Sequence, residues 1–248
     1  MELTVLVYNI WDGGDGRLDA LASVIGSQEP DVVALLEATS ESASALAGEL
    51  GLELAFGQSN SIFDLHVAWL SRLPVRRAQN HRLPALAKTL LEIDLDGTRL
   101  FATHLTSRHE ENAHPRDGEI RAILDVLGSY DEPHLLVGDF NALQPDDPIG
   151  APPPGIEKRG EAAPGAARVV LPPLATAGYA DCFRALHRYE PGFTYPSHAP
   201  WLRLDYIFAS PAMTAGLREC DVVTTNEARK ASDHLPVVAR FTASSGLM

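Results

Sequence analysis

The sequence has few cysteines and no long apolar run. Only Cys182 and Cys220 occur among its 248 residues, too few for a disulfide framework and spaced unlike a zinc site. We expect both to be buried free thiols. No apolar run reaches the length of a membrane span, and the N-terminus lacks the basic region and cleavage site of a signal peptide. These absences predict a soluble protein that is cytoplasmic by default.

Positive charge is also scarce. The chain has 20 Lys and Arg against 33 Asp and Glu, for a formal net charge of −13. Tight, sequence-independent binding to a long polyanion needs a basic stripe that displaces counterions, so the charge argues against it. Phosphate chemistry is not excluded, because divalent cations can supply positive charge locally.

What is present is an alternation of β-rich apolar runs with amphipathic helical stretches. Strands are predicted at 3–8, 31–36, 65–70, 88–94, 99–105, 134–137, 204–209 and 236–241, and helices at 18–27, 40–50 and 116–127. Ser40 or Thr39 can cap the second helix and Gly51 can end it. We expect an α/β fold, with two β-sheets packed as a sandwich and helices outside.

One segment, residues 145–173, breaks this rhythm and is rich in Pro, Ala and Gly. Loops this long are usually functional or mobile, and a linker between domains is the alternative. We interpret the segment as a loop over the active site of a single domain covering residues 1–248. Strands lie on both sides of it, and neither half closes a fold alone.

Polar residues recur at the ends of the predicted strands, where rigid backbone presents side chains to a common cleft. Each has an ordinary explanation as a turn former, a helix-entry acid, a half-buried histidine or a loop cap. Their coincidence in one chain favours a shared site. The residues are Asn9, Glu37, His104, Asp139, Asn141, Asp233 and His234.

The chemical types of these residues suit phosphoester hydrolysis. Mg²⁺ prefers hard oxygen ligands, and Glu37, Asp233 and the amide oxygen of Asn9 provide them. The reaction also needs an oriented water and a neutralised phosphoryl group. Asp139 can orient or deprotonate the water. His104 and His234 can contact the phosphoryl oxygens or transfer protons, and Asp205 can hold His234 in one tautomer.

The motifs around these residues resemble those of the endonuclease/exonuclease/phosphatase superfamily, in the same order and over nearly the whole chain. Gly-Asp-Phe-Asn and Ser-Asp-His-x-Pro together are the most specific. The motifs are Tyr8-Asn9, Leu35-Leu36-Glu37, Ser71-Arg72-Leu73-Pro74, Thr103-His104-Leu105, Gly138-Asp139-Phe140-Asn141, Arg203-Leu204-Asp205-Tyr206 and Ser232-Asp233-His234-Leu235-Pro236.

The resemblance implies a four-layer α/β sandwich of two mixed sheets and divalent-metal hydrolysis of a phosphoester, with Mg²⁺, or Mn²⁺ in its place. It implies the following roles: metal ligands Asn9, Glu37 and Asp233; water orientation by Asp139; phosphate contact by Asn141 and His104; and an Asp–His pair of Asp205 and His234. It leaves open how Asp139 and His234 divide the role of general base. Two departures are Leu36, where the family commonly has glutamine, and residues 145–173, which match no family segment and are interpreted as a specificity insertion.

The substrate is less defined, because members of the superfamily cleave DNA, RNA, inositol phosphates and sphingomyelin. Arg72 and Arg108 belong to two modest basic clusters predicted to contact the substrate, although a solvated surface is an equal explanation. Trp201 is a further predicted contact. Trp11 and Trp69 also lie near motifs, and all three indoles can stack on a substrate or simply pack.

The net acidity favours a small or short phosphodiester, with a DNA or RNA nuclease of the same superfamily as the alternative. No obligate protein partner is evident. From another class, a catalytically silent binding scaffold is disfavoured by the intact set of polar residues. A further alternative is a metal-dependent acyl or glycosyl hydrolase, of which the acyl version is disfavoured because the sequence lacks a Gly-x-Ser-x-Gly elbow.

Overall fold

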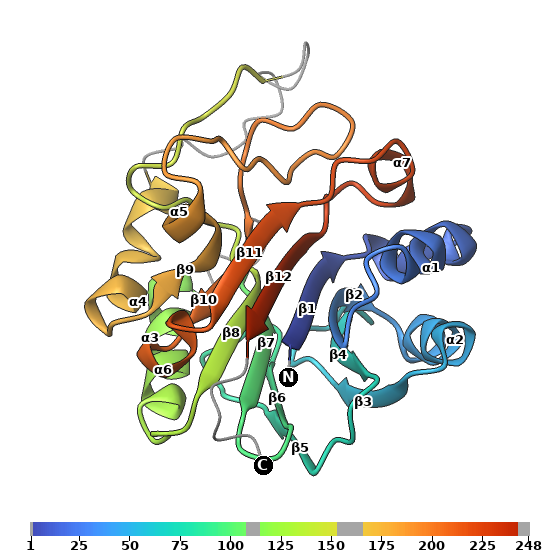
Figure 1. Cartoon of the computed structure of the whole chain (residues 1–248), viewed down its shortest axis with the longest axis horizontal. Helices are drawn as coiled ribbons and strands as arrows, with labels where there is room; N and C mark the ends of the chain where they lie inside the picture. Colours follow the sequence, from blue (N-terminus) through green and yellow to red (C-terminus); the bar gives the residue numbers. More distant parts are fainter. Residues whose placement is uncertain (1, 108–114, 153–165, 243–248) are drawn as a thin grey trace.

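The computed structural model describes residues 2–107, 115–152 and 166–242, and the remaining residues lie outside the description. Two mixed six-stranded sheets form the centre of the molecule (Figure 1). In the first sheet the order is β11 (Leu217–Val222), β12 (Val237–Thr242), β1 (Glu2–Asn9), β2 (Val32–Ala38), β4 (His66–Ser71) and β3 (Glu53–Gly57). β1 runs parallel to β2, and its other neighbour, β12, is antiparallel.

The second sheet has the order β5 (Arg77–His81), β6 (Leu90–Asp94), β7 (Arg99–His104), β8 (His134–Asp139), β10 (Asp205–Ala209) and β9 (Ala180–Asp181). β7 and β8 are parallel, whereas β10 runs antiparallel to β8. In each sheet, therefore, two central parallel strands end at the same edge.

The two sheets pack face to face, and helices cover their outer faces. Alternate side chains of a strand point to opposite faces, so Val5 and Val7 enter the core between the sheets while Leu6 and Tyr8 face the helices. The helices α1 (Leu18–Gly26), α2 (Ser40–Leu50) and α7 (Ala228–Ala231) cover the first sheet, and α3 (Arg116–Leu127) and α4 (Pro172–Thr176) cover the second (Figure 1). The predicted four-layer α/β sandwich is confirmed.

The helix α2 begins and ends as the sequence predicts. The Thr39 hydroxyl accepts a hydrogen bond from the Ser42 N–H at 3.1 Å, and the Ser42 side chain closes a capping box. Gly51 adopts the left-handed conformation, φ 64°, that commonly ends helices. The cap is thus Thr39 rather than Ser40.

Four strands and several short elements were not predicted. The strands are β3, β5, β9 and β11, and each is at the edge of its sheet. The short elements are η1 (Asp12–Gly14), η3 (Ala166–Val169), α4, α5 (Cys182–Leu186), α6 (Pro211–Thr214) and α7. Edge strands are often charged and half exposed, so they lack the apolar run on which the prediction rests.

The segment 145–173 is only partly the loop that we expected. Its last residues form η3 and the start of α4, and Val170 and Leu171 pack in the core beside α3. Residues 153–165 lie outside the described part of the chain. Arg168 joins the two described ends, because its guanidinium donates hydrogen bonds to the backbone oxygens of Gln144 at 2.9 Å and Asp147 at 2.7 Å.

The two cysteines are free and buried, as predicted. Cys182 and Cys220 lie in the core between the sheets, and burial raises the pKa of both thiols. Among the described residues, no helix combines the length and the apolarity needed to cross a bilayer.

Candidate active site

The predicted polar residues gather where the central strands of both sheets end. Asn9 is the last residue of β1, and Glu37 lies at the end of the parallel strand β2. His104 ends β7, beside Asp139 at the end of β8. Asp205 begins β10 and pairs directly with Asp139. The edge therefore brings together side chains that are far apart in sequence.

Asn9 connects the two sheets at this edge. Its amide nitrogen donates hydrogen bonds to Glu37 Oε1 and to Asp139 Oδ2, each at 3.1 Å. Its amide oxygen accepts one from the Trp11 N–H at 3.0 Å. The side chain is buried, and it fixes the carboxylate of the first sheet relative to that of the second.

Glu37 lies in a β-bulge and has a left-handed φ of 58°. That conformation turns its carboxylate out of the strand, where Oε2 accepts a hydrogen bond from the Asp12 N–H at 2.9 Å. Burial alone would raise the pKa of Glu37, but His104 together with the Asp12 and Asn9 hydrogen bonds lowers it below its ordinary value. The carboxylate is therefore held ionised.

Asp139 follows a glycine that cannot be replaced without moving backbone. A Cβ at Gly138, whose φ is 155°, would lie 1.9 Å from the carbonyl oxygen of Thr103. The close approach of β7 and β8 thus sets the position of Asp139, whose Oδ1 accepts a hydrogen bond from the Asn141 N–H at 2.9 Å. Burial raises the pKa of Asp139, and His234 only partly offsets this.

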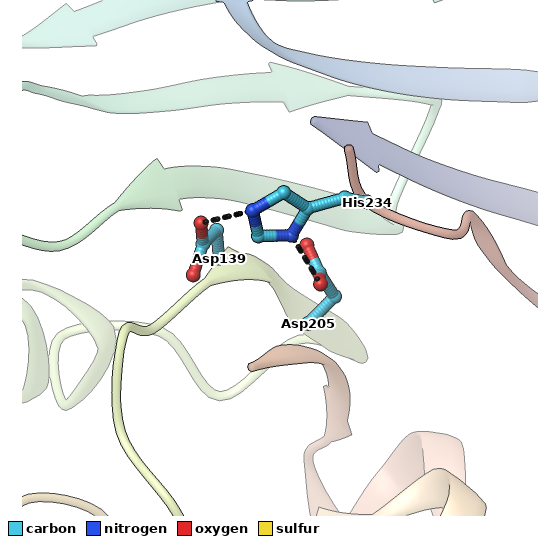
Figure 2. Close-up of side chains that lie close together, drawn as sticks. All are labelled: Asp139, Asp205 and His234. Atoms are coloured by element: carbon cyan, nitrogen blue, oxygen red, sulfur yellow. Dashed lines mark hydrogen bonds and ion pairs between the residues drawn. The ribbon is translucent and has the colours of Figure 1, made fainter. Parts of the chain in front are cut away.

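His234 lies between two carboxylates (Figure 2). Its Nδ1 is 2.8 Å from Asp205 Oδ2, and its Nε2 is 3.7 Å from Asp139 Oδ2. Burial disfavours the imidazolium, but Asp205 and then Asp139 outweigh burial and raise the pKa of His234 to about 10. The ring of Tyr195 packs against the imidazole with centroids 4.8 Å apart. His234 is therefore held in a fixed orientation between the two carboxylates.

His104 and Asn141 form the opposite side of Asp139. The Asn141 amide nitrogen lies 3.1 Å from His104 Nε2 and also donates to the Leu105 carbonyl at 3.1 Å. His104 Nε2 is 3.6 Å from Asp139 Oδ2. Asn141 has a left-handed φ of 45°, and Arg116 donates a hydrogen bond to its carbonyl oxygen. These two polar groups can contact a phosphate bound next to Asp139.

Asp233 completes the oxygen-rich side of the site. Its Oδ1 is buried and has no hydrogen-bond partner among the described residues. Burial raises the pKa of Asp233 to about 6, opposed by His234 and reinforced by Glu37. An unpartnered carboxylate oxygen near a second carboxylate is what a hard divalent cation would satisfy, so the residues present fit a metal.

A second group could also hold a metal ion. Ligand atoms of Asp139, Asp205 and His234 all lie within 4.8 Å of one another. In this group, however, each ring nitrogen of the histidine faces a carboxylate (Figure 2). That geometry suits a buried histidine that exchanges a proton with the two carboxylates better than it suits a metal ion.

The predicted substrate contacts have different positions. Arg72 is exposed and directly follows β4. The last residue of β4, Ser71, pairs with Val32 at the start of β2, whereas Glu37 lies at the other end of β2. The structure therefore does not bring Arg72 to the site. Trp201 is 8% exposed, and its backbone N–H donates a hydrogen bond to the carbonyl oxygen of Tyr195. Arg108 lies outside the described residues.

Sequence reasoning did not identify Asp12 and Tyr195, which position the site through a backbone N–H and a ring. It named Arg116 only as a member of the basic cluster around Arg108, and the structure shows its guanidinium bonded to the Asn141 carbonyl. The Asp12-Gly13-Gly14 turn, which begins three residues after Asn9, was the one available indication for Asp12. Tyr195 has no distinctive sequence context, because it comes from a segment distant from the motifs.

The geometry agrees with a family match. The model of the endonuclease/exonuclease/phosphatase family matches residues 6–234. The chain belongs to this family. It is therefore a phosphoester-hydrolysing enzyme of a divalent-metal-dependent superfamily. Among the described residues, Asp139, Asp205 and His234 are the group whose ligand atoms lie close enough together to hold an ion. The sequence matches no curated protein.

Solved structures share this fold. A 3′ phosphatase, NExo, from Neisseria, bound to a product DNA hairpin, is 22% identical with a TM-score of 0.77, covering 97% of this chain and 100% of that one. An AP endonuclease from Archaeoglobus fulgidus is 19% identical with a TM-score of 0.78, again covering 97% and 100%. Truncated TDP2 from Caenorhabditis elegans is 19% identical with a TM-score of 0.68, covering 98% of each chain. At these identities the likeness shows the fold alone.

Proposed function

We propose that the chain is a Mg²⁺-dependent phosphodiesterase that acts on a small or short phosphodiester, with Mn²⁺ able to replace Mg²⁺. One observation carries the proposal. Asp205, His234 and Asp139 form a buried row of polar side chains. The amide of Asn9 joins this row to Glu37, which with Asp233 forms an oxygen-rich group.

Glu37, Asp233 and the amide oxygen of Asn9 would hold the metal. When bound, the cation neutralises the phosphoryl oxygens and polarises the phosphorus centre. The amide oxygen already accepts the Trp11 N–H and keeps a second lone pair for a ligand bond. The partnerless Oδ1 of Asp233 supports the assignment.

The protein groups then divide the remaining work. Asp139 accepts hydrogen bonds on both oxygens and is positioned to orient a water and take its proton. Asp205 fixes the orientation of the His234 imidazole, so in this proposal His234 donates a hydrogen bond to a phosphoryl oxygen and Asp139 acts as the base. His104 and Asn141 contact the phosphate from the other side.

The net charge of −13 supports a short substrate, because a long nucleic acid requires extended positive surface. A DNA or RNA nuclease is the second candidate, and the NExo structure bound to a DNA hairpin favours it. We further propose a single domain for residues 1–248. We also propose that the segment 145–173, whose described ends Arg168 joins, contributes to the choice of substrate.

The test is turnover of bis-p-nitrophenyl phosphate and p-nitrophenyl phosphate with Mg²⁺, with Mn²⁺ and with EDTA. We expect faster turnover of the diester, loss of activity in EDTA and recovery on adding metal. A panel of single-stranded DNA, abasic duplex, RNA, cyclic dinucleotides and inositol phosphates then ranks substrates. EDTA-resistant turnover would overturn the metal assignment, and preference for long duplex DNA would favour the nuclease.

A further inference from the structure

The three tryptophans differ sharply in exposure. Trp69 is fully buried and donates its indole N–H to the Leu91 carbonyl at 3.1 Å. Trp201 is 8% exposed. Trp11, by contrast, is 47% exposed although it is only two residues beyond Asn9. Trp11 is thus the most exposed of the three tryptophans, and its position in the chain, close to Asn9, puts it within reach of a ligand bound at the site.

The active site itself fixes the backbone of Trp11. The Trp11 N–H bonds to the Asn9 amide oxygen at 3.0 Å, and the next N–H, from Asp12, bonds to Glu37 Oε2 at 2.9 Å. Both residues are in the left-handed region, with φ 55° and 48°. L-residues avoid that region unless the surroundings impose it, and such strain clusters at ligand sites.

Arg17 supports the indole from one side. Its guanidinium carbon lies 4.6 Å from the ring centroid of Trp11. The same guanidinium donates hydrogen bonds to the carbonyl oxygens of Ile10, Trp11 and Ala231. Backbone carbonyl groups therefore hold the Arg17 guanidinium in place. The indole packs against this cation, and Trp11 as a whole remains 47% exposed.

We propose that Trp11 is a stacking platform for a planar ring carried by the substrate next to its phosphate. The ring is a nucleobase or an aryl group, which share a flat π face. This inference rests on the proposed phosphodiesterase site, because the phosphate must be anchored beside Glu37 for the ring to reach Trp11. Stacking on an exposed aromatic accepts any base, since every base offers a π face. It would supply affinity without a basic surface.

Binding of matched ligand pairs tests the proposal without requiring turnover. One pair is thymidine 5′-phosphate and 2-deoxyribose 5-phosphate, and the other is phenyl phosphate and ethyl phosphate. Each pair keeps the phosphate and removes the ring. Dissociation constants are measured by calorimetry with the full chain in Mg²⁺. The two pairs distinguish a nucleobase from an aryl group as the preferred ring.

We expect the wild-type protein to bind the ringed member of at least one pair about tenfold more tightly. Trp11→Ala should remove that preference, and Trp11→Phe should keep part of it. Tyr189→Ala is the matched control, because Tyr189 is 86% exposed and, like Trp11, has an arginine, Arg188, over its ring. That variant should keep the full preference.

A ring preference that survives in Trp11→Ala, or no ring preference in the wild type, would overturn the proposal. An equal loss of affinity for ringed and ringless ligands in Trp11→Ala would also overturn it, because that pattern reports a damaged phosphate site. Turnover of bis-p-nitrophenyl phosphate is scored separately. Absent turnover with an intact, Trp11-dependent ring preference would remove the proposed reaction and leave the stacking site in place.

Discussion

At the scale of single residues, backbone strain is concentrated around the site. Among the residues that the structure describes, six other than glycine have positive φ, and four of them are Trp11, Asp12, Glu37 and Asn141. A left-handed conformation costs about 1–3 kcal/mol at a non-glycine residue. Each of the four makes a hydrogen bond that fixes Asn9, Glu37 or Asp139, so the strain accompanies the placement of polar groups.

The Asp205–His234 pair gives a direct test at this scale. Asp205→Asn keeps the size of the side chain but removes the charge that holds the imidazolium. We expect kcat on bis-p-nitrophenyl phosphate to fall by about 100-fold or more. Asp125→Asn, at an exposed position of α3, is the control and should change kcat little. Near-wild-type kcat in Asp205→Asn would refute the role given to the pair.

Gly138 makes the second residue-scale prediction. An added Cβ meets the Thr103 carbonyl oxygen at 1.9 Å, so Gly138→Ala must separate β7 from β8. We expect a loss of about 3 kcal/mol or more in the free energy of unfolding, measured in urea. Gly48→Ala on α2 is the control. No atom of the described part of the chain lies within 4 Å of its new Cβ, and alanine should stabilise the helix by roughly 0.5–1 kcal/mol.

At the scale of elements, the sequence predicts the interior of each sheet and misses the edges. Central strands such as β2 and β8 are covered on both faces and appear as continuous apolar runs. β5, with the sequence Arg-Ala-Gln-Asn-His, and β11, with Leu-Arg-Glu-Cys-Asp-Val, are polar edge strands. Their strand conformation comes from pairing with a neighbour, which local composition does not encode.

The helix cap of α2 supplies a prediction for one element. Thr39→Ala removes the hydroxyl that accepts the Ser42 N–H and should cost about 1 kcal/mol in urea unfolding. Ser40→Ala, at the exposed first residue of the helix, should change stability by less than about 0.5 kcal/mol. Equal effects would show that Thr39 is not the cap. Activity should be unchanged in both variants.

At the scale of the whole molecule, the sequence predicted which polar residues share the site, because the ends of neighbouring strands present their side chains to one region. Contacts that depend on the meeting of the two sheets were not. The hydrogen bond from Asn9 to Asp139 spans 130 residues, and the opposite-edge position of Arg72 follows from the register of β4 with β2. Both depend on strand pairing, which a single sequence does not give.

Stability against pH is a property of the whole fold and depends on Glu92. This buried carboxylate accepts hydrogen bonds from His81, Arg99 and Tyr130. Burial would raise its pKa, but these partners lower it below the ordinary value of 4.5. Because the folded-state pKa is lowered, the stabilisation is fully present above the ordinary value of 4.5 and is lost as the pH falls through the folded-state pKa.

We therefore expect Glu92→Gln to reduce stability near neutral pH and to flatten the decline of stability in the acid range below pH 4.5. Urea unfolding across that range measures both effects. Glu49→Gln, at an exposed position of α2, is the control and should follow the wild-type curve. An unchanged acid slope in Glu92→Gln would contradict the role of this cluster.

The amide of Asn9 has one more consequence. Because it joins a carboxylate of one sheet to a carboxylate of the other, neither sheet carries a working site by itself. A ligand bound at this junction contacts both sheets and so stabilises the packing of one against the other. Its binding free energy then adds to the resistance of the whole molecule to opening. Saturating ligand should slow proteolysis at the helices of both outer layers alike, although those helices touch no part of it.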